Sequence, residues 1–168
     1  MSLLWRNMNW LNILSPSKLP CDHAALERLE KRISRRLPSE YREFLISLNG
    51  GTVFVDHELK TQLYGETYEL AVACIFPLTD WGVVDTQERW LLNGCGSACA
   101  LPIADDGGTG FYFLLVDDEH RGQIYFAYKD EFFSTPPSDW PPVADELPSC
   151  LGFVAKDFAK FGELMGQK

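Results

Sequence analysis

The chain of 168 residues is long enough for one domain with a substantial core and too short for two comfortable ones. Its hydrophobic content of 46% is typical of an ordered globular protein, and no run approaches the roughly 18 apolar residues of a membrane-spanning helix. The net charge of −9 is uneven, since residues 1–60 hold nine Lys and Arg against seven Asp and Glu, whereas residues 61–168 hold six against 17.

The first 21 residues are interpreted as a segment that docks on a domain formed by residues 22–168. The apolar stretch that a secretion signal needs is interrupted by polar residues from Arg6 to Asn12, and no small-residue cleavage pattern follows. We therefore expect a cytoplasmic protein whose N-terminal segment caps the core through Leu4, Trp5, Trp10 or Leu11.

Two amphipathic helices are predicted next. Asp22 is a suitable N-cap for a helix over His23 to Arg35. A second helix begins at Pro38, because proline suits the first helical turn, and it ends at Asn49-Gly50-Gly51, where positive φ is tolerated. Its apolar stripe follows the spacing i, i+3, i+4 and i+7: Tyr41, Phe44, Leu45 and Leu48.

The remainder reads as strands, one short helix, a loop and a last helix. TVFVDHEL (52–59), YELAVACIFPL (68–78), ALPIADD (100–106), GFYFLLVDD (110–118) and GQIYFAYKD (122–130) have the β-branched and aromatic content of strands. A helix is predicted over residues 84–94. After a loop rich in Pro and Trp (134–148), a final helix is expected from Ser149, with Leu151, Val154, Phe158, Phe161 and Met165 buried. This order predicts a single α+β domain with a mostly antiparallel sheet and helices packed on one face.

The cysteines do not form a recognisable disulfide or metal framework. They are odd in number and irregularly spaced: Cys21, Cys74, Cys95, Cys99 and Cys150. The spacing of Cys95 and Cys99 suggests a zinc site as one hypothesis. However, zinc sites use tighter spacing with a second ligand pair, and the nearest following histidine is His120. We expect free thiols, no metal and no cofactor.

Two groups of residues are catalytic candidates. Asp105-Asp106 before Gly107-Gly108 is compatible with a cation site or a shared proton, but this sequence is also ordinary turn chemistry between two strands, which we favour. His57 lies between two acidic residues and is compatible with a metal or acid–base cluster, although no second histidine is near it. No phosphate-binding loop, dinucleotide fingerprint or nucleophile–base arrangement is present, so no enzyme activity is expected.

Three segments in order resemble the SUKH superfamily, which includes fungal cell-wall-assembly regulators and many bacterial immunity proteins. The first carries Leu37-Pro38, Tyr41, Phe44-Leu45 and Asn49-Gly50-Gly51 in the family's opening pattern. LPIADDGGTGFYFLLVDDEHRGQIYFAYKDE resembles the second block, with its acidic-glycine turn, and CLGFVAKDFAKFGELM resembles the closing helix with spaced phenylalanines. The resemblance covers about residues 22 to 165. The N-terminal segment and the insertion SDWPPVADELP depart from it.

The resemblance implies protein binding, because bacterial members of the family neutralise toxins that are often nucleases. A nuclease site is basic, so an acidic inhibitor surface would both steer and fit it. We predict a basic partner, a cognate toxin domain, bound by acidic residues that share one solvent-facing rim of the meander: Asp105, Asp106, Asp117, Asp118, Glu119, Asp130 and Glu131. Neither nucleic acid nor membrane is expected as a partner.

Aromatic anchors and other functions remain open from the sequence. Trp81, Trp90, Tyr112 and Trp140 are candidate anchors within the charged field, but large aromatic side chains more often belong to the core. A general regulatory or scaffold protein of the same fold is one alternative function. A metal-dependent hydrolase that uses Asp105, Asp106 and His57 is another.

Overall fold

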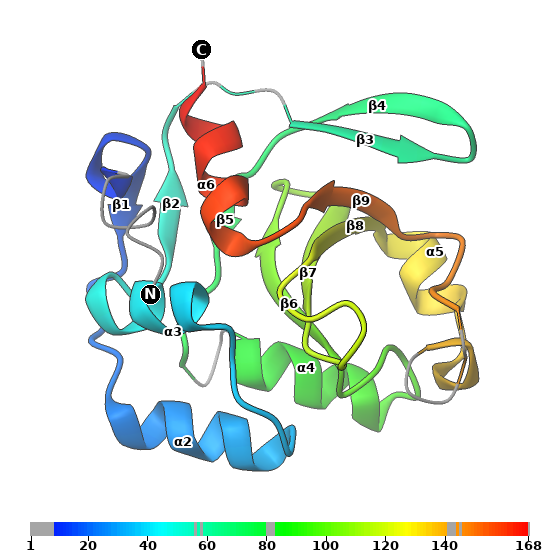
Figure 1. Cartoon of the computed structure of the whole chain (residues 1–168), viewed down its shortest axis with the longest axis horizontal. Coiled ribbons are helices and arrows are strands. Elements are labelled where there is room, and N and C mark those ends of the chain that lie inside the picture. The colour runs from blue at the N-terminus through cyan, green and yellow to red at the C-terminus, as the bar shows by residue number, and fades with distance from the viewer. Residues whose placement is uncertain are drawn as a thin grey trace.

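The computed structural model of the protein describes residues 9–55, 57, 59–79, 83–140, 144 and 146–167. Over these residues, seven strands form one sheet in the spatial order β1-β2-β5-β6-β7-β8-β9, and β3 pairs with β4 in a separate hairpin (Figure 1). All of these pairs are antiparallel. The strands are β1 (Leu14–Pro16), β2 (Gly51–Val53), β3 (Leu59–Leu63), β4 (Glu66–Leu70), β5 (Cys74–Ile75), β6 (Ala100–Asp105), β7 (Gly110–Leu115), β8 (Ile124–Tyr128) and β9 (Gly152–Ala155). The helices are η1 (Trp10–Asn12), α2 (His23–Arg32), α3 (Ser39–Ser47), α4 (Val83–Leu92), α5 (Lys129–Ser134), η2 (Pro137–Asp139) and α6 (Phe158–Gly166).

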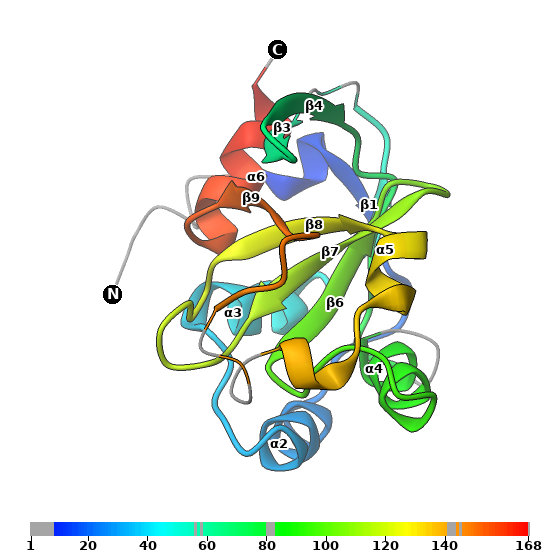
Figure 2. The same ribbon diagram turned by 90° about the vertical axis from the view of Figure 1, so that its right-hand side faces the viewer.

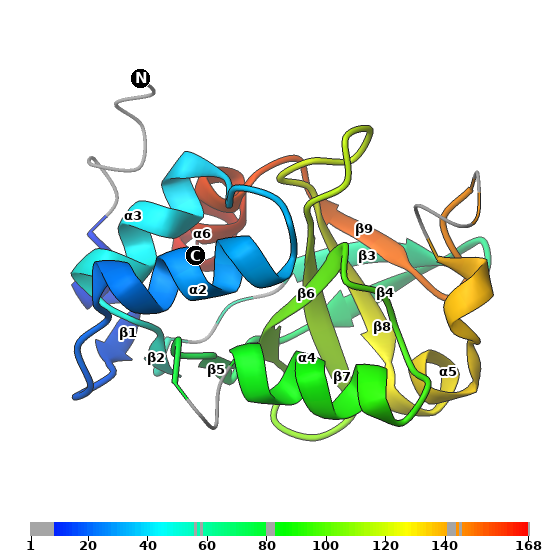
Figure 3. The same ribbon diagram turned by 90° about the horizontal axis from the view of Figure 1, so that it is seen from below.

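The predicted α+β class and antiparallel sheet are confirmed. The larger core contains the apolar residues predicted for the second helix. Figure 1 shows α6 above α3 and α2 below it, and Figure 3 shows the same three helices along the line of sight from below. The helices α3 and α6 are in contact. Tyr41, Phe44 and Phe158 are buried side by side, with the Phe44 and Phe158 ring centroids 4.9 Å apart. Trp10 joins this cluster by stacking on Phe158. Leu48 is only half-buried at the end of α3.

A second, smaller core covers the opposite face of the sheet, so the expectation of helices on one face is incomplete. Its fully buried aromatic members are Phe113, Phe132 and Trp140, and Trp90 packs against them. Figure 2 shows α3 and α6 on one side of the strands and α4 and α5 on the other. Successive side chains of β7 point to opposite faces of the sheet, so Tyr112 is buried in the first core and Phe113 in the second.

The C-terminal helix begins later than predicted. Residues 152–155 form the edge strand β9 against β8, and α6 begins at Phe158 with the Asp157 side chain accepting a hydrogen bond from the Lys160 N–H. Gly152 begins the strand β9 and lies very close to the β3–β4 hairpin. A Cβ at this position would be only 2.4 Å from the Thr61 hydroxyl. The same hydroxyl donates to the Phe153 carbonyl at 2.8 Å, which fastens the hairpin to the sheet edge.

Other element boundaries differ where the backbone turns. Asp22 caps α2 as predicted, but the helix ends at Arg32 because Ser34 adopts a φ of 54°. The strand predicted over residues 68–78 is divided between β4 and β5, and α5 was not predicted. The expected contacts Leu4 and Trp5 and the candidate anchor Trp81 lie outside the described residues. In the part of the chain that is described, no helix has the length and apolarity to span a membrane.

Candidate functional site

The sheet register divides the predicted acidic residues into two groups at opposite ends of β7. Gly110 at the start of β7 pairs with Tyr128 at the end of β8, whereas Leu114 pairs with Ile124. We call the first set the β6–β7 acidic group: Asp105, Asp106, Asp130 and Glu131. The second set, at the other end, is the β7–β8 acidic group: Asp117, Asp118 and Glu119. The single rim expected from the sequence is therefore incorrect.

Within the β6–β7 group, the Asp106 carboxylate holds the turn between β6 and β7 together. Its Oδ1 accepts hydrogen bonds from the N–H groups of Gly108, Thr109 and Gly110 at 2.7–3.0 Å, and its Oδ2 accepts one from the Thr109 hydroxyl. Burial disfavours the ionised form, but these four hydrogen bonds outweigh it, and the pKa of Asp106 falls below its usual value. The geometry therefore supports the interpretation of Asp105-Asp106-Gly107-Gly108 as a turn between two strands.

The neighbouring Asp105 has the opposite electrostatics. Partial burial raises its pKa, and the hydrogen bond from the Gly107 N–H and the charge of Lys129 offset this only in part. Asp105 lies opposite Phe111 in the register of β6 and β7, so both side chains project from the face that carries α5. Asp105 is therefore a carboxylate held near an apolar surface rather than a freely hydrated one.

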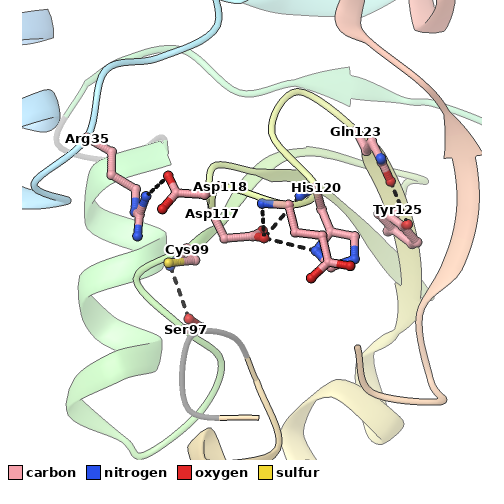
Figure 4. A network of polar contacts seen from close by, with 9 residues as sticks. Arg35, Ser97, Cys99, Asp117, Asp118, His120, Gln123 and Tyr125 are labelled. Atoms are coloured by element: carbon pink, nitrogen blue, oxygen red, sulfur yellow. Dashed lines mark hydrogen bonds and ion pairs between the residues drawn. The ribbon is translucent and has the colours of Figure 1, made fainter. Parts of the chain in front are cut away.

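The β7–β8 group is largely engaged in contacts within the protein, as Figure 4 shows. Asp117 is 5% exposed, and its Oδ2 accepts hydrogen bonds from the Glu119 and His120 N–H groups and lies 2.9 Å from the His120 ring. Asp118 accepts a hydrogen bond from the Arg35 guanidinium at 2.5 Å. Glu119 is exposed. Two of these three carboxylates thus fasten a loop and a helix end.

The five cysteines all have free thiols, two of them buried. Burial raises the pKa of the Cys99 thiol, and the neighbouring Arg35 guanidinium counteracts this only partly. Burial also raises the pKa of Cys21, Cys74 and Cys150. Neutral thiols are poor nucleophiles and poor metal ligands at neutral pH. Among the described residues, no cluster of three or more His, Cys, Asp and Glu has the geometry to hold a metal ion.

His57, the third residue of the hydrolase hypothesis, is occupied by backbone contacts. Its Nδ1 lies 2.9 Å from the Val55 carbonyl, and its Nε2 accepts a hydrogen bond from the Val72 N–H at 2.7 Å. With Nδ1–H donating to the carbonyl, the one ring lone pair is on Nε2, and the hydrogen bond from Val72 already occupies it. Its two acidic sequence neighbours, at positions 56 and 58, lie outside the described residues.

The aromatic candidates separate clearly by burial. Trp140 and Tyr112 have exposed fractions of 0% and belong to the two cores. Trp90 is half-buried, and its ring contacts those of Phe111 and Phe133. Phe133 is 45% exposed and was missed from the sequence. The available signal was Phe132-Phe133 beside a short acidic run, since adjacent residues of a helix point in different directions and a short helix beside charged residues buries one ring more readily than two.

A model of the SMI1 / KNR4 family (SUKH-1) matches residues 20–161 of the chain. The chain belongs to the SUKH-1 family. No curated protein matches it. The matched range contains both acidic groups and the aromatic candidates Trp81, Trp90, Tyr112, Phe133 and Trp140. SUKH-1 proteins are generally non-enzymatic immunity or regulatory proteins, so the family is consistent with either role.

The SUKH-1 domain also has an open groove of about 630 Å³ between the α2–α3 corner, the β7–β8 loop and the start of α6. Arg36, Arg42 and Arg121 line it, together with Glu30, Glu40 and Asp157. The six charges balance, and several are already engaged: Glu30 accepts a hydrogen bond from the Leu37 N–H and lies 3.6 Å from Arg42. The groove therefore has no net charge with which to select a ligand.

Proposed function

We propose that this SUKH-1 protein is a non-enzymatic binding module, an immunity protein that neutralises a basic, nuclease-type toxin domain through the β6–β7 acidic group. The observation that carries the proposal is the position of Asp130 and Glu131. They follow β8 directly at the end of the sheet where Asp105 and Asp106 lie, and no side-chain hydrogen bond or ion pair is found for them among the described residues. Carboxylates to which the described residues offer no partner can pair with a cation from outside the protein.

Electrostatics supports a basic partner for this surface. The two turns that carry the group supply four carboxylates and one lysine, Lys129, so the formal charge of residues 105–110 and 129–131 is negative. Such a field accelerates association with a positive surface and repels anionic ones such as nucleic acid. Because single exposed ion pairs are each worth less than about 1 kcal/mol, the effect is expected from the group as a whole.

The test uses the product of the gene directly upstream, co-expressed with this protein and examined by pull-down and by a growth assay. Binding and protection of the cells are the expected results. Failure to bind or to protect overturns the immunity proposal and leaves a regulatory role for the same fold.

Two charge-reversal variants with equal change in charge locate the surface. Asp130→Lys with Glu131→Lys should slow association about 10-fold at low salt, and added salt should remove the difference. The matched control, Asp118→Lys with Glu119→Lys, alters the opposite end of β7 and should change the rate less than about twofold. A larger effect of the control pair, or an affinity that ignores salt and both pairs, contradicts the assigned surface.

A further inference from the structure

Three aromatic rings form a partly exposed cluster beside the β6–β7 acidic group. The Trp90 ring centroid lies 4.6 Å from that of Phe111 and 5.7 Å from that of Phe133, and the Phe111 and Phe133 centroids are 6.5 Å apart. Trp90 comes from α4, Phe111 from β7 and Phe133 from α5, so three elements fix the rings in place. We call these residues the aromatic cluster.

The charges around this cluster are arranged for a cation. Asp105 is the register partner of Phe111, and Asp130 precedes Phe133 by three residues, on the same side of the short helix α5. Lys129 from the same turn places its Nζ 4.9 Å from the centroid of the Phe111 ring. The chain itself thus places an ammonium group over one ring of the cluster, that of Phe111, and leaves the exposed ring of Phe133 without one among the described residues.

We propose that the aromatic cluster is the anchor of the binding surface and that it receives an arginine or lysine side chain of the partner. This inference rests on the proposed function and adds the residues and the chemistry of the contact. The partner's aliphatic stem would cover the exposed ring of Phe133, and its charged head would lie among Asp105, Asp130 and Glu131. Interfaces draw most of their energy from such central aromatic contacts, with charged residues around them.

Charge complementarity selects this occupant over the others that an exposed aromatic surface can accept. A second copy of the chain would bring its own acidic group against this one, and an anionic lipid surface would meet the same repulsion. A purely apolar peptide would leave the surrounding carboxylates without partners as they lose water. A cationic side chain satisfies both the rings and the carboxylates.

The experiment measures binding of a fluorescein-labelled oligo-arginine peptide to the full chain, with an oligo-citrulline peptide as its neutral analogue. The arginine peptide should bind and shift the Trp90 indole resonance, assigned with Trp90→Phe, whereas the citrulline peptide should do neither. Phe133→Ala should weaken binding about 2- to 30-fold, the range of cation–π contributions. Phe133→Leu keeps the apolar volume and should lose a similar factor, while Phe133→Trp should restore binding.

Phe153→Ala is the matched control, because Phe153 is exposed to a similar extent, 48% against 45%, but lies on β9. It should bind the peptide like the unaltered chain. Equal losses from Phe133→Ala and Phe153→Ala, or full binding by Phe133→Leu, overturn the anchor.

The charge variants separate failure of the anchor from failure of the proposed function. If Asp130→Lys with Glu131→Lys abolishes salt-dependent binding while Phe133→Ala has no effect, the acidic surface stands and the anchor is wrong. If binding of the peptide ignores that charge reversal as well as salt, the acidic surface itself is contradicted.

Discussion

Replacement of Asp106 by alanine tests whether this carboxylate serves the fold. The substitution removes the acceptor for three backbone N–H groups and one hydroxyl. A buried hydrogen bond to a charged group is worth about 1.5–3 kcal/mol, but this turn is partly exposed, so water recovers much of that energy. We expect a net loss of about 2 kcal/mol, in line with the loss of a helix N-cap.

Urea unfolding followed by tryptophan fluorescence measures this loss at neutral pH. Because a domain of this size shifts by about 2–4 °C per kcal/mol, the thermal midpoint should fall by about 4–8 °C. Asp106→Asn keeps the Oδ1 acceptor for all three N–H groups and should lose less than about 1 kcal/mol. Equal losses in the alanine and asparagine variants would refute the assignment of the stability to these hydrogen bonds.

The pH dependence has a definite sign for both turn carboxylates. Folding lowers the pKa of Asp106, so its contribution is present above the unfolded value of about 3.9 and is lost as the pH falls through the lower folded value. The difference between the unaltered chain and Asp106→Ala should therefore shrink below about pH 4. Folding raises the pKa of Asp105, so its ionisation opposes folding as the pH rises, and Asp105→Asn should be neutral or stabilising at pH 7.

Phe44→Ala should cost about 3–5 kcal/mol in urea unfolding, because Phe44 is 1% exposed among three other rings, and a loss below about 1 kcal/mol would contradict its place in the core. Gly110→Ala should cost about 1–3 kcal/mol, since its Cβ would lie 2.1 Å from a buried phenylalanine ring, whereas Gly108→Ala, with no atom within 4 Å of its Cβ, should cost little. Thiol titration of the unreduced, denatured chain should find all five cysteines reactive, and in the native state Cys99 and Cys150 should react slowly because each is 5% exposed. Fewer reactive thiols after denaturation would contradict the absence of disulfides.

The sequence predicted the parts of the fold that local signals control. Asp22 at the start of α2 and Asn49-Gly50 after α3 act within a few residues, and the structure places them as predicted. The strand β9 depends on pairing with β8, which is remote in sequence. Leu151, Val154 and Phe158 also fit a helical spacing, so their apolar pattern alone could not identify the strand. Val154 is nevertheless buried, because either conformation turns it toward the core.

The acidic residues illustrate a different limit. All seven were placed at turns or strand ends, but successive turns of an antiparallel meander lie at opposite ends of the sheet. The turn before β7 and the turn after it therefore cannot share a rim, and this follows from the strand order once it is known. Asp130 returns to the first end only because β8 brings the chain back. The helix α5, which presents Phe133, is too short for a helical period to be recognised in its sequence.

The two acidic groups differ in their contacts within the protein, and this difference leads to a prediction that separates a role in the fold from a role in binding. Asp117 is buried and holds two N–H groups and the His120 ring, so Asp117→Ala should lower the free energy of unfolding by about 1–3 kcal/mol. Asp130→Ala and Glu131→Ala remove side chains for which the described residues offer no partner, and each should change stability by less than about 0.5 kcal/mol. The two substitutions together should weaken binding of the oligo-arginine peptide. If they unfold the chain as readily as Asp117→Ala, these carboxylates serve the fold, and the surface proposed for the partner loses its basis.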